Sequence, residues 1–154
     1  MRGVAKDKRR KPLLIPACGR WNFHFYPPDE SLTSLYDLFR PPLSKKAKGR
    51  LSLTLDHLAQ KRKNEWSRPQ ASPLGHSKYV IRFKDENNAQ KRLFGHFYDD
   101  HDAFVVTLSG CEKDDRYYPV DYDSRSTDYK VICDANFNTE TIPVENRCII
   151  CQSN

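Results

Sequence analysis

Basic side chains recur at alternate positions between Lys78 and Lys113, on three apolar runs separated by two short polar turns. Successive side chains of a β-strand point to opposite faces, so each run has one apolar face and one polar face. The polar faces carry Arg82, Lys84, Arg92 and His96, with Lys113 at the rim. This pattern predicts a groove that binds phosphate groups, because arginine and lysine neutralise their charge.

His96 is the candidate acid or base on this face, because an unperturbed imidazole titrates at about pH 6.5. The alternative for His96 is an exposed strand histidine without a chemical role. For Arg82 and Arg92 the alternative is a surface salt bridge to an acidic residue of the two turns. The candidates for such a bridge are Asp85, Glu86 and Asp99.

The three runs, 78–84, 91–98 and 103–109, predict an antiparallel meander. The turns at 85–88 and 99–102 are rich in Asp and Asn and short enough for hairpins. The core face is expected to hold the alternate apolar residues Tyr79, Ile81, Phe83, Leu93, Phe97, Phe104, Val106 and Leu108. The opposite face is expected to include Val105, Thr107, Ser109 and Cys111.

The N-terminal half predicts one strand and two helices. Residues 20–26 alternate, with Trp21, Phe23 and Phe25 facing the core, and this strand is expected to pair with the meander. Leucines at helical spacing predict helices near 31–40 and 45–63, the second capped by Ser44. Residues 67–76 are expected to form a loop. The fold class is therefore α+β, with order β-α-α-β-β-β and both N-terminal helices on one face of a small antiparallel-dominated sheet.

The charge of the chain is uneven. Residues 1–113 contain 22 Lys and Arg against 12 Asp and Glu, a net +10, whereas residues 114–154 contain 4 against 8, a net −4. A basic body favours a polyanionic partner, and an acidic tail can fold back on that body. The alternative is a solvated surface of ordinary variability. Residues 1–19 are expected to be a basic arm, which either contacts nucleic acid or is simply solvated.

Residues 120–154 are expected to be an acidic, strand-like extension docked on a domain of residues 20–119. Short apolar runs predict strands at 129–133 and 139–144, forming an added strand or hairpin. One or more of its carboxylates would then lie near the basic groove, the candidates being Asp121, Asp123 and Asp128.

Five cysteines are scattered through the chain. Cys148 and Cys151 have the C-x-x-C spacing that can bind zinc, with Cys111 and Cys133 as further ligands. Because a second C-x-x-C pair is absent from the sequence, buried free thiols are the favoured reading. We expect no metal and no cofactor. The sequence has no apolar segment of about 18 residues, so we expect no membrane partner and a cytoplasmic location.

The meander also resembles a known family. The segment Tyr79-Val80-Ile81-Arg82-Phe83, then Arg92-Leu93-Phe94, and then 105–108 followed by Gly110, Lys113 and Pro119 resembles the RelE/ParE superfamily of toxins. The similarity is greatest to the HigB-like and phage-encoded branch, and covers roughly residues 20–119. The chain departs from the family at 112–116, where a Lys-Lys-Thr segment is usual. The C-terminal helix of the family is also not evident here.

The resemblance implies a metal-independent endoribonuclease that cleaves mRNA, either at the ribosome or free of it, and is neutralised by a cognate antitoxin protein. Arg82 and Arg92 would clamp the scissile phosphate, Lys113 matches a family lysine, and His96 would exchange protons. Substrate would be bound by Lys84, Lys45, Lys46, Tyr117 and Tyr118. The two tyrosines would stack on bases or serve as a weak acid, or else pack at the sheet edge. The alternatives are a non-catalytic module of the same fold, binding nucleic acid or a protein such as gyrase, and an inactive mobile-element relative.

Overall fold

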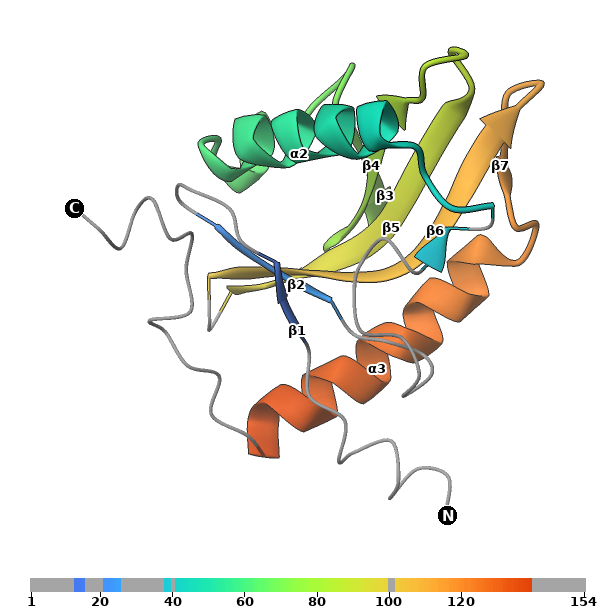
Figure 1. The fold of residues 1–154 in the computed structure, drawn as a ribbon. Helices are drawn as coiled ribbons and strands as arrows, with labels where there is room; N and C mark the ends of the chain where they lie inside the picture. Colours follow the sequence, from blue (N-terminus) through green and yellow to red (C-terminus); the bar gives the residue numbers. More distant parts are fainter. Residues whose placement is uncertain (1–12, 16–20, 26–37, 40, 100–101, 140–154) are drawn as a thin grey trace.

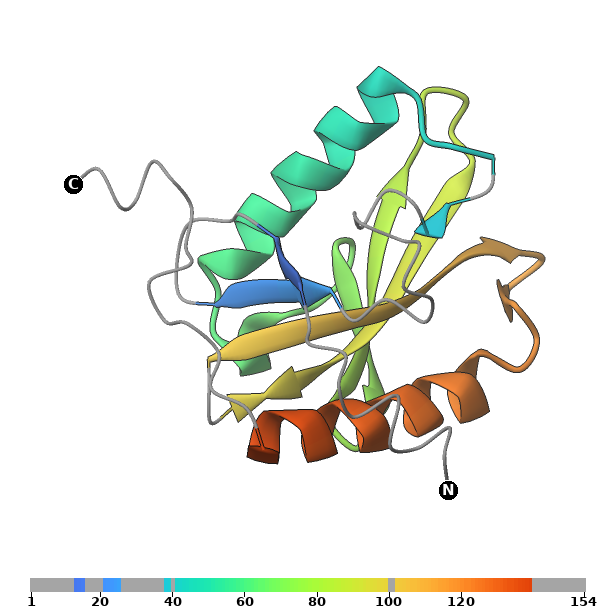
Figure 2. The ribbon, with the colours of Figure 1, turned by 60° about the horizontal axis from the view of Figure 1, so that its bottom comes forward.

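A mixed seven-stranded sheet lies between the two α-helices of the described part of the chain, as Figures 1 and 2 show. This computed structural model describes residues 13–15, 21–25, 38–39, 41–99 and 102–139. The strand order is β1-β2-β6-β5-β4-β3, with β7 also paired to β6. The fold class is α+β, as expected, but among the described elements one of the two α-helices follows all of the strands.

The elements occur in the following order along the chain. They are β1 (Leu13–Ile15), β2 (Asn22–Phe25), α2 (Lys45–Ala59), the 3-10 helix η2 (Lys63–Glu65), β3 (Ala71–Gly75), β4 (Lys78–Lys84), β5 (Gln90–Tyr98), β6 (Ala103–Lys113), β7 (Arg116–Tyr118) and α3 (Tyr122–Thr139). The helix expected near 31–40 lies mainly outside the described residues, as do the segment 140–154 and all of the expected basic arm 1–19 except residues 13–15, which form β1 rather than an unstructured arm.

The predicted meander is present as β4, β5 and β6, which pair antiparallel. The N-terminal strand also joins it, because β2 runs parallel to β6. Ile81 and Phe83 belong to the buried cluster that includes Leu51 of α2, so the expected core face is correct for β4. Members of this cluster from the other strands include Phe23, Leu93, Phe97, Phe104 and Val106.

α2 begins where the sequence predicts. The Ser44 hydroxyl accepts a hydrogen bond from the Ala47 amide at 3.1 Å, which satisfies one of the free N–H groups of the first turn. The helix buries Leu51, Leu55 and Leu58 against the sheet and ends at Ala59, earlier than the expected 63. Two layers, helix on sheet, therefore form the main core.

A β-bulge in β6 corrects the predicted faces of that strand. Phe94 pairs with Leu108 while Gly95 pairs with Val106, so Thr107 is the extra residue. The bulge reverses the alternation, and Leu108 lies with Val80 and Phe94 rather than with Val106. A side chain at Gly95 would collide with the Val105 carbonyl oxygen, which explains the glycine beside the bulge.

The expected loop at 67–76 contains an edge strand. Residues 71–75 form β3, which pairs with β4 and buries Ala71 and Ser72. The strand was not predicted because it contains Pro73 and Gly75, residue types that are typical of loops. Pro73 is tolerated because β3 is at the edge of the sheet, where the register shifts between Pro73 and Gly75.

The C-terminal extension is helical where a strand was expected at 129–133. α3 runs from Tyr122 to Thr139 across the sheet face opposite α2, so the strand prediction is wrong there. The Tyr122 ring stacks on Phe94 with centroids 5.1 Å apart, and Cys133 packs on Val105. A short apolar run such as 131–133 fits a helix or a strand equally well. Of the second expected strand, 139–144, only Thr139 is described, and it ends α3.

None of the described helices combines the length and the apolar character that crossing a bilayer requires.

Candidate functional site

A pocket of about 630 Å³ opens at the edge of the sheet, where β4 continues past the start of β3. The first residue of β3 pairs with Ile81, and the Gln70 carbonyl accepts a hydrogen bond from the Arg82 amide at 2.8 Å. Beyond that point β4 borders α2 and the segment before β3. The lining residues are Arg50, Leu53, Thr54, Arg68, Pro69, Gln70, Arg82, Phe83, Lys84, Gln90 and Arg92.

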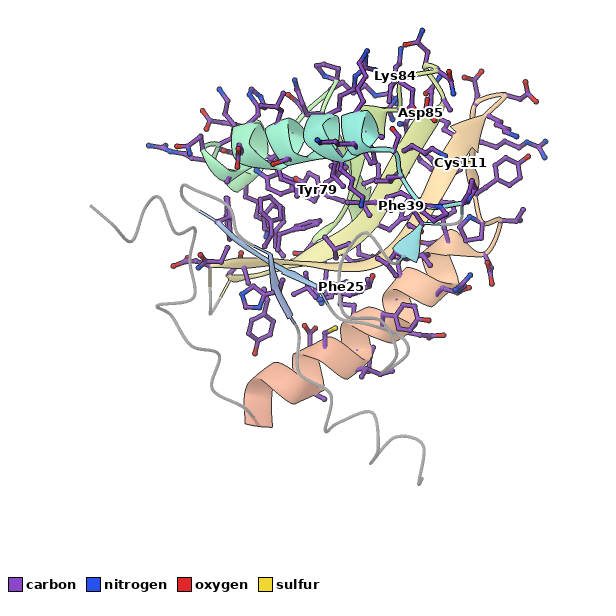
Figure 3. The ribbon with its side chains drawn as sticks, viewed as in Figure 1. Phe25, Phe39, Tyr79, Lys84, Asp85 and Cys111 are labelled. Carbon is purple, nitrogen blue, oxygen red and sulfur yellow. The ribbon has the colours of Figure 1, made fainter. Side chains whose placement is uncertain are left out.

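The lining of this basic pocket is strongly positive. α2 supplies Arg50, the segment before β3 supplies Arg68, and the sheet supplies Arg82, Lys84 and Arg92. The described residues that line the pocket include no acidic side chain. In Figure 3, Lys84 and Asp85 lie together at the end of the sheet beside the start of α2. The potential in the pocket therefore favours an anion.

Two of these arginines face each other and share one carboxylate. Arg82 and Arg92 are partners in the β4–β5 register. Glu112 accepts hydrogen bonds from Arg92 Nε at 2.9 Å and Nη2 at 2.7 Å, and lies 3.4 Å from Arg82 Nη1. Burial lowers the pKa of Arg92, and its hydrogen bond to Glu112 opposes that shift. Glu112 thus makes it possible for two guanidinium groups to lie side by side within the fold.

The five cations differ in their freedom to bind a ligand. Arg92 is engaged by Glu112, Gln90 and the Lys91 carbonyl, and its side chain is only 3% exposed. Arg50 donates one hydrogen bond, from Nη1 to the Asp85 carbonyl at 2.7 Å. Arg68 and Lys84 are exposed, and within the described part of the chain the structure gives neither a hydrogen bond nor an ion pair.

His96 lies on the expected face of β5, but outside the pocket and beneath α3. Its side chain is 1% exposed, and burial together with the nearby Lys130 charge lowers its pKa to about 3. Asp134 Oδ1 is 3.9 Å from His96 Nε2, too far for a hydrogen bond. His96 is therefore a neutral, buried imidazole at physiological pH, whereas the sequence placed it in an open groove.

The stability of the protein should depend on the ionisation of His96. Unfolded His96 titrates near its ordinary pKa of 6.5 and folded His96 at about 3, so between these values the unfolded state binds more protons. The free energy of unfolding should therefore fall as the pH drops through this window, by up to about 1.4 kcal/mol per pH unit. Urea unfolding at several pH values in this window measures the free energy of unfolding. Its slope against pH should be shallower for His96→Gln than for the wild type.

His57→Gln serves as the control for this measurement, because His57 is an exposed histidine of α2. The two substitutions make the same chemical change, so other titrating groups cancel from the comparison. Equal slopes for His96→Gln and the wild type would contradict the burial of a neutral imidazole.

The other predicted residues are dispersed. Lys113 is exposed at the end of β6, where it pairs with Arg116 of β7, and Tyr117 accepts a hydrogen bond from Arg82 Nη1 at 3.1 Å. Tyr118 is half-buried and pairs with Cys111 across the same two strands. Lys45 and Lys46 are exposed on the first turn of α2 and do not line the pocket. The structure therefore brings together Arg82, Lys84 and Arg92, with Tyr117 next to them.

The cysteines of the described part do not assemble a metal site. Cys111 is partly exposed on β6, whereas Cys133 belongs to α3 and is buried between that helix and the sheet, where burial raises the pKa of its thiol. Cys148 and Cys151 lie outside the described residues. Among the described residues, no group of three or more His, Cys, Asp or Glu side chains could hold a metal ion.

Three residues of the site were not identified from the sequence. Arg50 is one of several cations on the outer surface of the expected helix, and Arg68 lies in a segment read as a loop. Glu112 is the third, in the segment where the chain departs from the family pattern. The available signal was a carboxylate where the family pattern has a basic segment, but the bulge determines that it faces the arginines.

Comparison with protein-family models, with curated proteins and with solved structures found no match for this chain. The fold and the pocket therefore define the class of protein by themselves: an α+β domain with an arginine-rich pocket at the edge of its sheet.

Proposed function

We propose that the protein binds single-stranded RNA through the basic pocket, as a domain of the RelE/ParE-like toxin class. The observation that carries this proposal is the lining of the pocket, which has five cations and, among its described residues, no acidic group. Arginine and lysine neutralise nucleic-acid phosphates, and these contacts supply a large share of the binding affinity. The net charge of +10 over residues 1–113 would also attract a polyanion from a distance.

The resemblance to the toxin family supports the same proposal. The meander covered by α2 agrees with the resemblance, and α3 adds a C-terminal helix, which the family usually has and which was not evident in the sequence. The setting proposed with this function is the cytoplasm, with mRNA at the ribosome as the target. A cognate antitoxin protein with an acidic surface would compete for the same cations.

Cleavage of the bound RNA is the second candidate function, and the contact between Arg82 and Tyr117 favours it. Arg82 Nη1 donates to the Tyr117 hydroxyl oxygen at 3.1 Å, so the phenol proton remains available for another acceptor. A phenol beside the phosphate-binding cations could protonate the leaving oxygen, while Arg82 stabilises charge on the phosphorane. His96 does not take part, because it is buried beneath α3.

Charge reversal at the two unengaged cations tests the binding proposal. The variant Arg68→Glu/Lys84→Glu should bind a single-stranded RNA at least about tenfold more weakly than the wild type, because two phosphate contacts become repulsive. The control is Lys45→Glu/Lys46→Glu, which changes the net charge equally at exposed sites outside the pocket. Fluorescence anisotropy at several salt concentrations measures both affinities and their salt dependence.

Equal losses in the two variants would mean that RNA responds only to net charge, and would contradict binding at the pocket. The same incubations, analysed on a denaturing gel, separate the two candidate functions. Shortened RNA would support the endoribonuclease, whereas intact RNA with pocket-dependent binding would support a binding module.

A further inference from the structure

One wall of the basic pocket contains an exposed apolar side chain. Leu53 is 71% exposed on the outer surface of α2, although Leu51, Leu55 and Leu58 of the same helix are buried in the core. Leu53 therefore adds nothing to the packing of α2 on the sheet. A single exposed leucine is ordinary on a protein surface, but this one lines a cavity, together with Pro69 and Phe83.

Two arginines flank this apolar patch. Arg50 precedes Leu53 by three residues on α2, so the two side chains lie on the same side of the helix. Arg68, beside Pro69, approaches from the segment before β3. The hydrogen bond from Arg50 to the Asp85 carbonyl fixes the position of its guanidinium group. Guanidinium planes and apolar side chains both pack against the faces of unstacked bases.

The phosphate-binding capacity lies in another part of the same cavity. Arg82 and Lys84 come from β4, two residues apart and therefore on the same face of the strand. The cavity thus combines an apolar patch with a separate pair of cations. Its volume of about 630 Å³ falls within the range of about 300–1,000 Å³ that is typical of sites for small ligands.

We propose that the pocket holds one unpaired nucleotide of the RNA, with its base against Leu53 and its phosphate on Arg82 and Lys84. This inference rests on the proposed RNA binding and specifies that the pocket recognises a single unpaired nucleotide. A base within a duplex is stacked on both faces and cannot enter such a cavity without leaving the helix. The pocket therefore selects single-stranded segments by shape, and phosphate alone uses only the cationic part of it.

Small probes test this directly. In the wild type, a ribonucleoside 5′-monophosphate should bind more tightly than ribose 5-phosphate by up to about tenfold, since its base packs against Leu53 and a guanidinium plane. The two probes carry the same sugar and phosphate, so their difference reports the base. Leu53→Ala should remove most of this difference while leaving the affinity for ribose 5-phosphate unchanged. Val131→Ala, at an exposed valine of α3, should leave both affinities unchanged. NMR titration of the backbone amides measures these weak affinities and identifies the pocket.

The outcome separates this inference from the proposed function. If Arg68→Glu/Lys84→Glu weakens RNA binding but the two probes bind the wild type equally, RNA binding stands and the base-binding inference fails. If the base adds affinity that Leu53→Ala removes, but RNA does not bind, the pocket takes free nucleotides and the proposed function fails. A short single-stranded RNA that binds no better than the same sequence held in the stem of a hairpin also overturns the inference.

Discussion

Glu112→Ala is expected to reduce the free energy of unfolding by about 3–5 kcal/mol, the usual range when one partner of a buried ion pair is removed. Glu112 is the carboxylate that accepts two hydrogen bonds from Arg92 and lies beside Arg82. Without it, the almost fully buried Arg92 would keep its charge opposite a second guanidinium group. Urea unfolding at neutral pH measures the loss.

Asp128→Ala is the control for this variant. Asp128 is an exposed carboxylate of α3, and within the described part of the chain the structure gives it no hydrogen bond or ion pair. Its removal should leave the unfolding midpoint nearly unchanged. The double variant Arg82→Ala/Glu112→Ala should lose less stability than the sum of the two single variants, because removal of Arg82 also removes the repulsion. A loss for Glu112→Ala no larger than that for Asp128→Ala would show that the arginines do not depend on this carboxylate.

The alternation of β4 and β5 could be predicted because it depends on local properties of the chain. Each strand is bounded by a short turn, and the strict alternation of side chains places Ile81 and Leu93 on the core face. The N-cap role of Ser44 could be predicted in the same way, since a serine hydroxyl just before a helix commonly accepts a hydrogen bond from an amide of the first turn. These features require no knowledge of the partner strand.

The bulge at Thr107 could not be predicted, because it is defined by pairing between two strands. Its consequence is large. Beyond Thr107 every side chain of β6 changes face, which places Leu108 beside Phe94 and brings Glu112 to the arginines. A sequence reading that keeps strict alternation places Glu112 on the opposite face and misses the pair.

α3 was missed for a different reason. Much of its contact with the sheet is polar: Lys78, 4% exposed, donates to Asp123 at 2.5 Å and to Thr127 at 2.8 Å. A helix with so many polar contacts shows a weak apolar stripe, and its short apolar run at 131–133 resembles a strand. Asp123 was expected near the basic groove, but it pairs with Lys78, and neither residue lines the basic pocket.

Cys133→Asp is expected to destabilise the domain by more than about 3 kcal/mol, a value in the range for an unpaired charge placed in a core. Cys133 is fully buried and packs against Val105, with Tyr98 and Ile132 beside it. An aspartate there would be forced to ionise without a partner or to separate α3 from the sheet. Because whole domains are stable by only about 5–15 kcal/mol, partial or complete unfolding is expected.

Val131→Asp introduces the same side chain two residues earlier on the same helix, where the native valine is 64% exposed. It should unfold at nearly the wild-type urea concentration, because the new carboxylate remains in water. Limited proteolysis provides a second measurement. Cleavage within 122–139 should be rapid for Cys133→Asp and slow for Val131→Asp, since only the first substitution disturbs the packing of α3 on β5 and β6. Unfolding of the two variants at the same urea concentration, with equal rates of cleavage, would show that α3 does not form part of the folded core. The sheet face with His96 and Lys78 would then be open to solvent.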